Sequence, residues 1–189
     1  MERNSAVRPF EDWRRTEFSF CPKCGGSLAR RILKTTEPSR LVCAECSFVF
    51  FLDPKVAVGA IVSLDGHILL LRRANEPSYG KWVFPGGFVD RGESLEDAAV
   101  RETREETNLE VRVTSLLNVY STLDHPVVVI VYRAEAVHGQ PSVGDEALEV
   151  RAFHPTDLPW DDLAFPSTKE ALREYLQTTS PKPAVPNIP

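Results

Sequence analysis

The alternation of apolar and polar side chains is that of β-strands from Val56 onward. Residues 56–64 and 67–72 form two apolar runs, and Asp65-Gly66 separates them. An Asp-Gly pair between two such runs is typical of a tight hairpin, because both turn residues take positive φ. Further apolar runs bounded by turn-forming residues predict strands at 81–84, 111–121, 127–137 and 149–153. The first of these is expected to end at the breaker sequence Pro85-Gly86-Gly87.

The spacing of apolar residues changes to a helical period over residues 95–109. Ser94 is the expected N-cap, and Asp97 three residues later completes an approximate capping box. Asn108 tolerates the left-handed conformation that a C-cap residue adopts. We therefore expect one helix inside the strand-rich region.

The two ends of the chain differ from this region. A second helix is expected over residues 167–177, where Ser167 and Glu170 form another capping box. The last ten residues contain four prolines, so we expect the tail 179–189 to be disordered. Residues 1–20 are polar with scattered aromatic side chains, and their pattern predicts no particular structure.

The cysteines form two C-x2-C pairs, Cys21 with Cys24 and Cys43 with Cys46, separated by eighteen residues. This spacing predicts a four-thiolate zinc site, because two residues between thiols let one tight turn present both sulfurs to one metal. The segment 21–51 is too short to bury much apolar surface, so the zinc would supply folding energy. The alternative is four unrelated buried or free thiols.

Three glutamates of the first helix lie where core-facing residues are expected. With Glu102 at 0° and about 100° per residue, Glu105 and Glu106 fall within about 60° of it. The same stripe holds Leu95, Ala98, Ala99 and Leu109, and the opposite side holds Glu96, Asp97, Arg104 and Thr107. A charge run is usually a solvated helix face, but here other polar side chains already form that face. Crowded carboxylates repel one another, and their oxygens prefer Mg²⁺ or Mn²⁺ as partners.

The segment from Gly87 to Leu109 resembles the Nudix box, G-x5-E-x7-R-E-U-x-E-E-x-G-U with U apolar. Two positions depart from it: Thr103 fills an apolar slot, and Asn108 replaces the final glycine. The resemblance covers residues 52–178 and implies an α+β fold, a Nudix-type α/β/α sandwich around a mixed β-sheet, here preceded by a small zinc ribbon at 21–51. The six fixed positions that match are Gly87, Glu93, Arg101, Glu102, Glu105 and Glu106.

The resemblance also implies a chemistry: hydrolysis of a nucleoside diphosphate linked to another group, with Mg²⁺ or Mn²⁺. By the family pattern, Glu102 and Glu106 would bind the metal directly, and Glu105 would bind it directly or through water. The Gly86 carbonyl would be a further ligand. Glu93 and Arg101 would hold the loop and the helix together. Bound metals would polarise the phosphoryl oxygens and lower the pKa of the attacking water.

Residues outside the box are expected to complete the site. Many Nudix enzymes place another glutamate on a loop after the central strands, and Glu146 is the residue we expect there, with a solvated loop position as the alternative. Arg72, Trp82 and Gly87 are the expected substrate contacts. A core position is the alternative for Trp82, and a solvated strand end is the alternative for Arg72.

Resemblance to Nudix enzymes of known substrate is the only basis for choosing among the expected substrates. The segment 163–167 is similar to one in zinc-ribbon Nudix enzymes that act on ADP-ribose and FAD. NADH pyrophosphatases carry S-Q-P-W-P-F-P after the box, and the stretch 120–126 lacks it. We therefore expect ADP-ribose or FAD ahead of NADH, with AMP as one product. A nucleoside triphosphate remains open, and so does a nucleotide-binding sensor without turnover.

Composition and charge restrict the partners. The chain has 189 residues, 42% hydrophobic and 26% charged, with a net charge of −5. This balance argues against a broad surface for nucleic acid, and no apolar run reaches the roughly 18 residues of a membrane span. The first residues lack the apolar run of a secretory signal, so we expect a cytoplasmic protein. A small nucleotide is the expected partner, and a homodimer is an open option for the assembly.

Overall fold

The computed structural model describes residues 18–123 and 125–179. The predicted disordered tail 179–189 lies outside these residues except for Thr179, which the structure places at the end of a helix, and most of the unassigned segment 1–20 lies outside them as well. The chain divides into two compact units that meet between Pro54 and Lys55. Each unit has its own sheet. No helix in the described part of the chain is long and apolar enough to cross a membrane.

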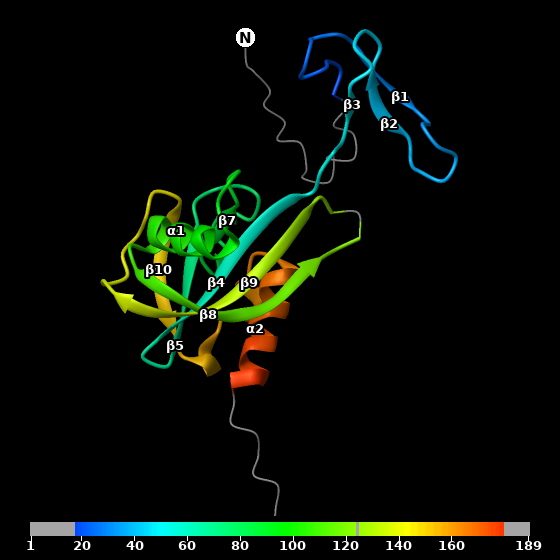
Figure 1. Cartoon of the computed structure of the whole chain (residues 1–189). Helices are drawn as coiled ribbons and strands as arrows, with labels where there is room; N and C mark the ends of the chain where they lie inside the picture. Colours follow the sequence, from blue (N-terminus) through cyan, green and yellow to red (C-terminus); the bar gives the residue numbers. More distant parts are fainter. Residues whose placement is uncertain (1–17, 124, 180–189) are drawn as a thin grey trace, which may run out of the picture. The chain divides into compact units, whose positions relative to one another are not determined.

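The first unit is a small antiparallel sheet of three strands, labelled in Figure 1. Its strands are β1 (Leu28–Arg31), β2 (Arg40–Cys43) and β3 (Val49–Phe50), in that order. Among its described residues, the buried apolar side chains are those of Cys21, Leu41, Val42 and Cys43. So little apolar burial does not hold a unit of this size together, and two of these four residues are cysteines.

The second unit is built on a mixed sheet with the strand order β10-β5-β4-β9-β8. The pairing of β4 with β9 is parallel, whereas the other neighbours are antiparallel. Two short strands lie off this path, β6 beside β5 and β7 beside β4. The bounds are β4 (Lys55–Leu64), β5 (His67–Arg73), β6 (Trp82–Val83), β7 (Gly86–Phe88), β8 (Glu110–Ser121), β9 (Val127–His138) and β10 (Ala147–Phe153).

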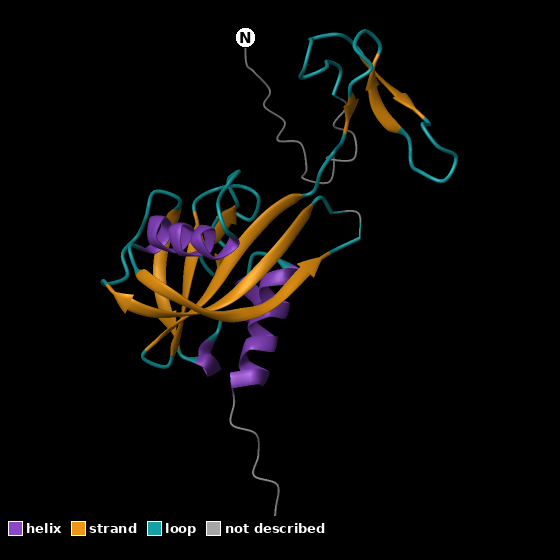
Figure 2. Ribbon diagram, in the orientation of Figure 1, coloured by secondary structure: helices purple, strands orange, loops and turns teal. Residues whose placement is uncertain are grey.

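Two helices cover opposite faces of this sheet, α1 (Leu95–Thr107) and α2 (Pro166–Thr179) (Figure 2). Successive side chains of a strand point to opposite faces. In β4, Val58 therefore packs with Ala98 and Ala99 of α1, whereas Ile61 packs with Leu172 of α2. Two 3₁₀ turns, Pro155–Asp157 and Trp160–Asp162, connect β10 to α2. The predicted α/β/α sandwich is confirmed.

The predicted turn at Asp65-Gly66 and the predicted caps of the first helix are confirmed. Asp65 and Gly66 have φ of 49° and 76°, as the predicted turn requires. The Ser94 hydroxyl accepts a hydrogen bond from the Asp97 amide at 3.1 Å, which confirms the N-cap. Asn108 has φ of 56° and its amide donates to the Arg104 carbonyl, so the helix ends at Thr107 rather than at the predicted 109.

Two boundaries were predicted wrongly. The second helix begins at Pro166, so Ser167 lies within its first turn and is not its cap; proline suits a first turn because its missing N–H would have no partner there. The predicted break at Pro85-Gly86-Gly87 instead continues into β7, which pairs with β4. A Cβ on Gly86 would lie 2.2 Å from the Val58 carbonyl oxygen, so glycine permits a close approach of the two strands.

Candidate active site

A single guanidinium connects the loop before α1 to the helix. Nε and Nη2 of Arg101 donate to the two carboxylate oxygens of Glu93 at 2.8 and 2.9 Å, and Nη2 also donates to the Phe88 carbonyl at 3.2 Å. Nη1 donates to Glu102 at 2.8 Å and to Glu105 at 3.1 Å. The hydrogen bonds from Arg101 lower the pKa of Glu93 and raise the pKa of Arg101. Arg101 therefore fixes the loop on the helix and faces three carboxylates.

Glu106 is the most deeply buried carboxylate of the site. It is 9% exposed, and its Oε2 accepts a hydrogen bond from the Gly86 amide at 2.8 Å. Burial raises its pKa to about 8, against the effect of the Gly86 hydrogen bond, and the charges of Glu102 and Glu146 act in the same direction as burial. A buried carboxylate with like charges beside it is a group that a cation would stabilise.

Glu102 lies directly against the glycine strand β7. Its side chain is 15% exposed, and a Cβ on Gly87 would lie 2.4 Å from its Oε2. Burial raises the pKa of Glu102, Arg101 opposes this rise, and the charges of Glu105 and Glu146 add to it. A side chain at position 87 would therefore displace the Glu102 carboxylate from this place beside the backbone.

The inward side of α1 differs from the predicted one. Its buried stripe is centred about 50° away from Glu102. Glu105, predicted on the inward stripe, has a side chain that is 59% exposed, and Thr107, predicted on the polar side, is buried. The buried residues of the helix are Ala98, Ala99, Thr103, Glu106 and Thr107.

The two buried threonines explain this rotation. Thr103 donates its hydroxyl hydrogen to the Ala99 carbonyl at 2.7 Å, and Thr107 donates to the Thr103 carbonyl at 2.6 Å. A threonine whose hydroxyl is bonded to its own helix packs much like an apolar residue. Thr103 therefore fills the apolar slot of the box without an unpaired polar group in the core.

The loop between β9 and β10 brings a further carboxylate to α1. The amides of Ser142 and Gly144 donate to the carbonyls of Thr107 and Glu106 at 3.0 and 3.1 Å, which satisfies the end of the helix. β10 begins at Ala147, so Glu146 lies on this loop as predicted. Its side chain is exposed, and its charge raises the pKa of both Glu102 and Glu106.

Gly144 is a residue of this site that the sequence did not single out. A Cβ at this position would lie 2.1 Å from the Glu105 carbonyl oxygen and 2.9 Å from the Glu106 Cα. The absence of a side chain is therefore what lets the Glu146 loop lie on α1. The signal in the sequence was the glycine two residues before the predicted loop glutamate.

The predicted substrate contacts fall in different places. Gly87 faces the carboxylates, as described above. Arg72 is exposed, and its Nε donates to the Gly80 carbonyl at 2.7 Å. The Trp82 ring is buried in the core against Phe153, with ring centroids 4.9 Å apart, so it is not available for stacking on a base. Trp82 belongs to the short strand β6, both of whose residues are buried, so it takes the core position that was its alternative.

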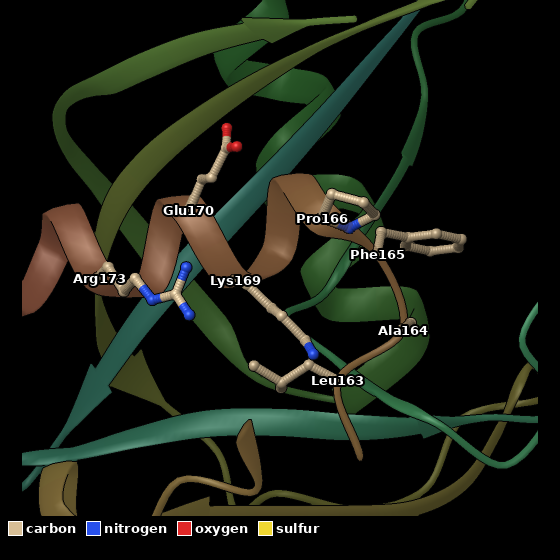
Figure 3. Close-up of a pocket in the computed structure, with 7 residues that line it drawn as sticks. All are labelled: Leu163, Ala164, Phe165, Pro166, Lys169, Glu170 and Arg173. Atoms are coloured by element: carbon tan, nitrogen blue, oxygen red, sulfur yellow. The ribbon is translucent and has the colours of Figure 1, made fainter. Parts of the chain in front are cut away.

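Arg73, the neighbour of Arg72, connects the carboxylates to a pocket. Its guanidinium lies over the Phe165 ring at 5.1 Å, and the charges of Glu106 and Glu146 act on it. Phe165 lines a cavity of about 270 Å³ at the start of α2, whose wall also includes Leu163, Lys169 and Arg173 (Figure 3). In Figure 3 the Glu170 carboxylate points away from Lys169 and Arg173. Lys169 lies in the first turn of α2, where anions are favoured, and Arg173 lies one turn further along the helix.

The four cysteines of the first unit gather at one point, and their sulfurs all lie within 4.8 Å of one another. Sulfur–sulfur distances of 3.8, 3.5 and 3.3 Å link Cys21 to Cys46, Cys24 to Cys43 and Cys24 to Cys46. Four thiolates about 2.3 Å from a tetrahedral zinc lie roughly 3.8 Å apart, so the cluster fits that ion. Backbone amides donate to the sulfurs of Cys21, Cys24 and Cys43.

Removing one sulfur tests the zinc site. We expect Cys43→Ser to lose the approximately one zinc per chain of the wild type and to unfold the segment 21–46, because a closed four-thiolate site depends on all its ligands. Elemental analysis measures the zinc. Ser47→Gly is the matched control, since Ser47 has φ of 57° and glycine accepts that conformation. Absence of zinc from freshly purified wild-type protein would refute the site.

Burial of Glu106 makes stability depend on pH. Its pKa of about 8 in the folded protein lies above its usual value of 4.5, so its contribution to stability is present at low pH and is lost as the pH rises through about 8. Without added Mg²⁺ or Mn²⁺, we expect this contribution to lower the melting temperature of the zinc-loaded protein as the pH rises from about 4.5 to about 8 and to level off above that. Glu106→Gln should flatten this fall, whereas the exposed-site control Glu110→Gln should not. Parallel profiles for wild type and Glu106→Gln would contradict the burial.

Comparison with known proteins gives two family matches. The family model described as NUDIX domain matches residues 53–175, and the model described as Nudix N-terminal matches residues 19–51. A solved NUDIX hydrolase from Nitrosomonas europaea is 36% identical with a TM-score of 0.82, and the likeness covers 86% of this chain and 92% of that one.

Two curated relatives differ in how much of them this chain covers. An ADP-ribose pyrophosphatase of Methanocaldococcus jannaschii is 41% identical over 131 residues, 67% of this chain and 76% of that protein. The NAD-capped RNA hydrolase NudC of Vibrio vulnificus is 36% identical over 94 residues, 49% of this chain but only 33% of that protein. Because the box residues, the sandwich and the cysteine cluster agree with both family models, the chain belongs to the Nudix family, as a Nudix hydrolase preceded by a zinc ribbon.

Proposed function

We propose that the protein hydrolyses the pyrophosphate bond of a nucleoside diphosphate linked to another group, with ADP-ribose or FAD as substrate and Mg²⁺ or Mn²⁺ as cofactor. The observation that carries the proposal is the buried Glu106 beside the half-buried Glu102, both against the glycine strand β7. Their raised pKa values show that the protein alone disfavours their charged forms. A hard divalent cation, which prefers carboxylate oxygens, fits this donor set.

The residues take distinct roles in this proposal. Glu102 and Glu106 would hold the metal, with the Gly86 carbonyl as a further ligand and Glu105 at the exposed edge. When bound, the metal would polarise the phosphoryl oxygens and make a nearby water more acidic. Arg101 positions Glu102 through its hydrogen bond and keeps the loop on the helix through Glu93.

Glu146 is the group we propose to accept a proton from the attacking water. It lies on an exposed loop, and the close approach of Gly144 to Glu105 and Glu106 keeps that loop against α1. Water attacks one phosphorus of the diphosphate, the bond to the bridging oxygen breaks, and AMP and the other phosphate half leave. A base within reach of the water contributes typically 10²–10⁴-fold to such a step.

The rest of the substrate would lie toward the pocket at the start of α2. Arg73 connects that pocket to Glu106 and Glu146, and Lys169 and Arg173 supply positive charge in its wall. The pocket is formed by the segment 163–167, which resembles one in Nudix enzymes for ADP-ribose and FAD. The archaeal relative named ADP-ribose pyrophosphatase supports the same substrate class.

A dinucleotide such as NADH, or an NAD cap on RNA, is the second candidate. It is supported by the Vibrio relative named NAD-capped RNA hydrolase, although this chain spans a third of that protein. Against it, the stretch 120–126 lacks the aromatic-proline sequence of NADH pyrophosphatases. A nucleotide sensor without turnover is the candidate of a different class, and the intact box residues argue against it.

The proposed role of Glu102 on α1 is tested by replacing its carboxylate with an uncharged amide of the same shape. We expect Glu102→Gln to lower the Mg²⁺-dependent rate at least about a hundredfold, the scale of losing a positioned metal or proton-transfer group. The fold should survive, because one of several crowded carboxylates becomes neutral. Steady-state rates and melting curves measure both effects. Glu96→Gln is the matched control on the same helix, since Glu96 bonds only the Tyr132 hydroxyl among the described residues. A near-wild-type rate for Glu102→Gln would refute its role.

The substrate is tested by comparing kcat/KM for ADP-ribose, FAD, NADH and dGTP under one metal condition. We expect ADP-ribose or FAD to lead and AMP to appear among the products. A lead of NADH or dGTP by about tenfold, or roughly 1.4 kcal/mol of transition-state stabilisation, would overturn this ranking. If none of the four turns over while nucleotide still binds, the sensor explains the protein better than the hydrolase.

A further inference from the structure

The charges of the chain are divided unevenly between its two units. Residues 21–51 contain five lysines and arginines against two aspartates and glutamates, whereas residues 55–189 contain thirteen against twenty. These two parts carry net charges of +3 and −7, and together with Asp53 they account for the −5 of the whole chain, because residues 1–20 contain four charges of each sign. A ligand with negative charges would be attracted to the ribbon and repelled by most of the other surface.

Two arginines stand side by side on one face of the ribbon sheet. Arg31 of β1 and Arg40 of β2 are directly opposite each other in the antiparallel register. Directly opposite residues have Cβ atoms about 4.5–5.5 Å apart and point to the same face, and like charges in such a pair are destabilising. Neither arginine forms an ion pair with any residue that the structure describes. An anion between the two guanidinium groups would remove the repulsion.

An aromatic ring completes this face. The Arg40 guanidinium lies over the ring of Phe51 at 5.2 Å, and Phe51 is 53% exposed. The Nε of Arg40 is buried and has no hydrogen-bond partner within the described residues. The face thus offers the guanidinium groups of Arg31 on β1 and Arg40 on β2 and the exposed ring of Phe51, the residue after β3. Figure 1 shows the three strands of this sheet.

We propose that the Arg31–Arg40–Phe51 face of the zinc ribbon binds single-stranded nucleic acid. Guanidinium groups pair with phosphates in a bidentate manner, and an exposed aromatic ring stacks on a base of any identity. The alternation of phosphate and base along one strand matches the neighbouring cations and ring. This surface belongs to the first unit and the carboxylates belong to the second, so the proposal does not depend on the proposed hydrolysis.

The test measures binding of the zinc-loaded full-length protein to a fluorescein-labelled RNA 12-mer by fluorescence anisotropy, without Mg²⁺ or Mn²⁺. We expect a Kd below about 0.1 mM at low salt, the range of nonspecific complexes. Arg31→Gln should weaken binding about tenfold, or roughly 1.4 kcal/mol, and reduce the salt slope by about 0.7. Phe51→Leu should weaken binding at least about fivefold with the slope unchanged, because stacking involves no counterion.

Lys34→Gln is the matched control, since it removes the same charge from an exposed side chain that pairs with Glu37 rather than with this face. It should change the Kd by less than about twofold if the face is specific. Zinc content and melting temperature must equal those of the wild type in all three variants. The proposal fails if RNA does not bind, if Lys34→Gln weakens binding as much as Arg31→Gln, or if the protein binds phosphatidylserine vesicles but not RNA.

Discussion

The burial of Glu106 against the Gly86 amide is the constraint on which the hydrolase unit depends. A carboxylate that is 9% exposed and lies near two other carboxylates raises the free energy of the folded protein when it is charged. The carboxylates stay close together, and hydrogen bonds from neighbouring groups reduce this cost. The Gly86 amide binds Glu106 directly, and Arg101 neutralises the neighbouring Glu102. A buried carboxylate held in this way is a candidate functional residue, because a purely structural position would be filled more favourably by an apolar side chain.

Glycine residues at three positions make this arrangement sterically possible. Gly86 and Gly87 let β7 lie beside β4 and beside the Glu102 carboxylate, and Gly144 lets a distant loop lie on the end of α1. Each of these positions would place a Cβ within 2.5 Å of another heavy atom. The site is therefore an assembly of two loops on one helix, and the sheet underneath fixes where those loops begin.

Local signals predicted much of this structure, and tertiary packing decided the rest. The hairpin at Asp65-Gly66 and the caps of α1 are set by a few neighbouring residues, so the sequence was sufficient for them. The sequence was not sufficient to predict which side of α1 faces inward. That orientation depends on the buried Thr107, whose hydroxyl donates to the Thr103 carbonyl of its own helix. The strand at Gly86 was missed for the same reason: its partner is β4, which lies far away in the sequence. The box glutamates were found by their motif, whereas Gly144 could be recognised only from the surface it touches.

The division of charge shows why a whole-chain average can mislead. A net charge of −5 argues against nucleic acid only if the charges are spread evenly, and here the basic residues of 21–51 precede a strongly acidic unit. The same separation suits a hydrolase with a buried carboxylate site. Acidic surroundings favour divalent cations near α1, while the basic charge of the ribbon attracts anions instead of those cations. The net charge of each unit, rather than that of the whole chain, therefore indicates which ligands that unit can attract.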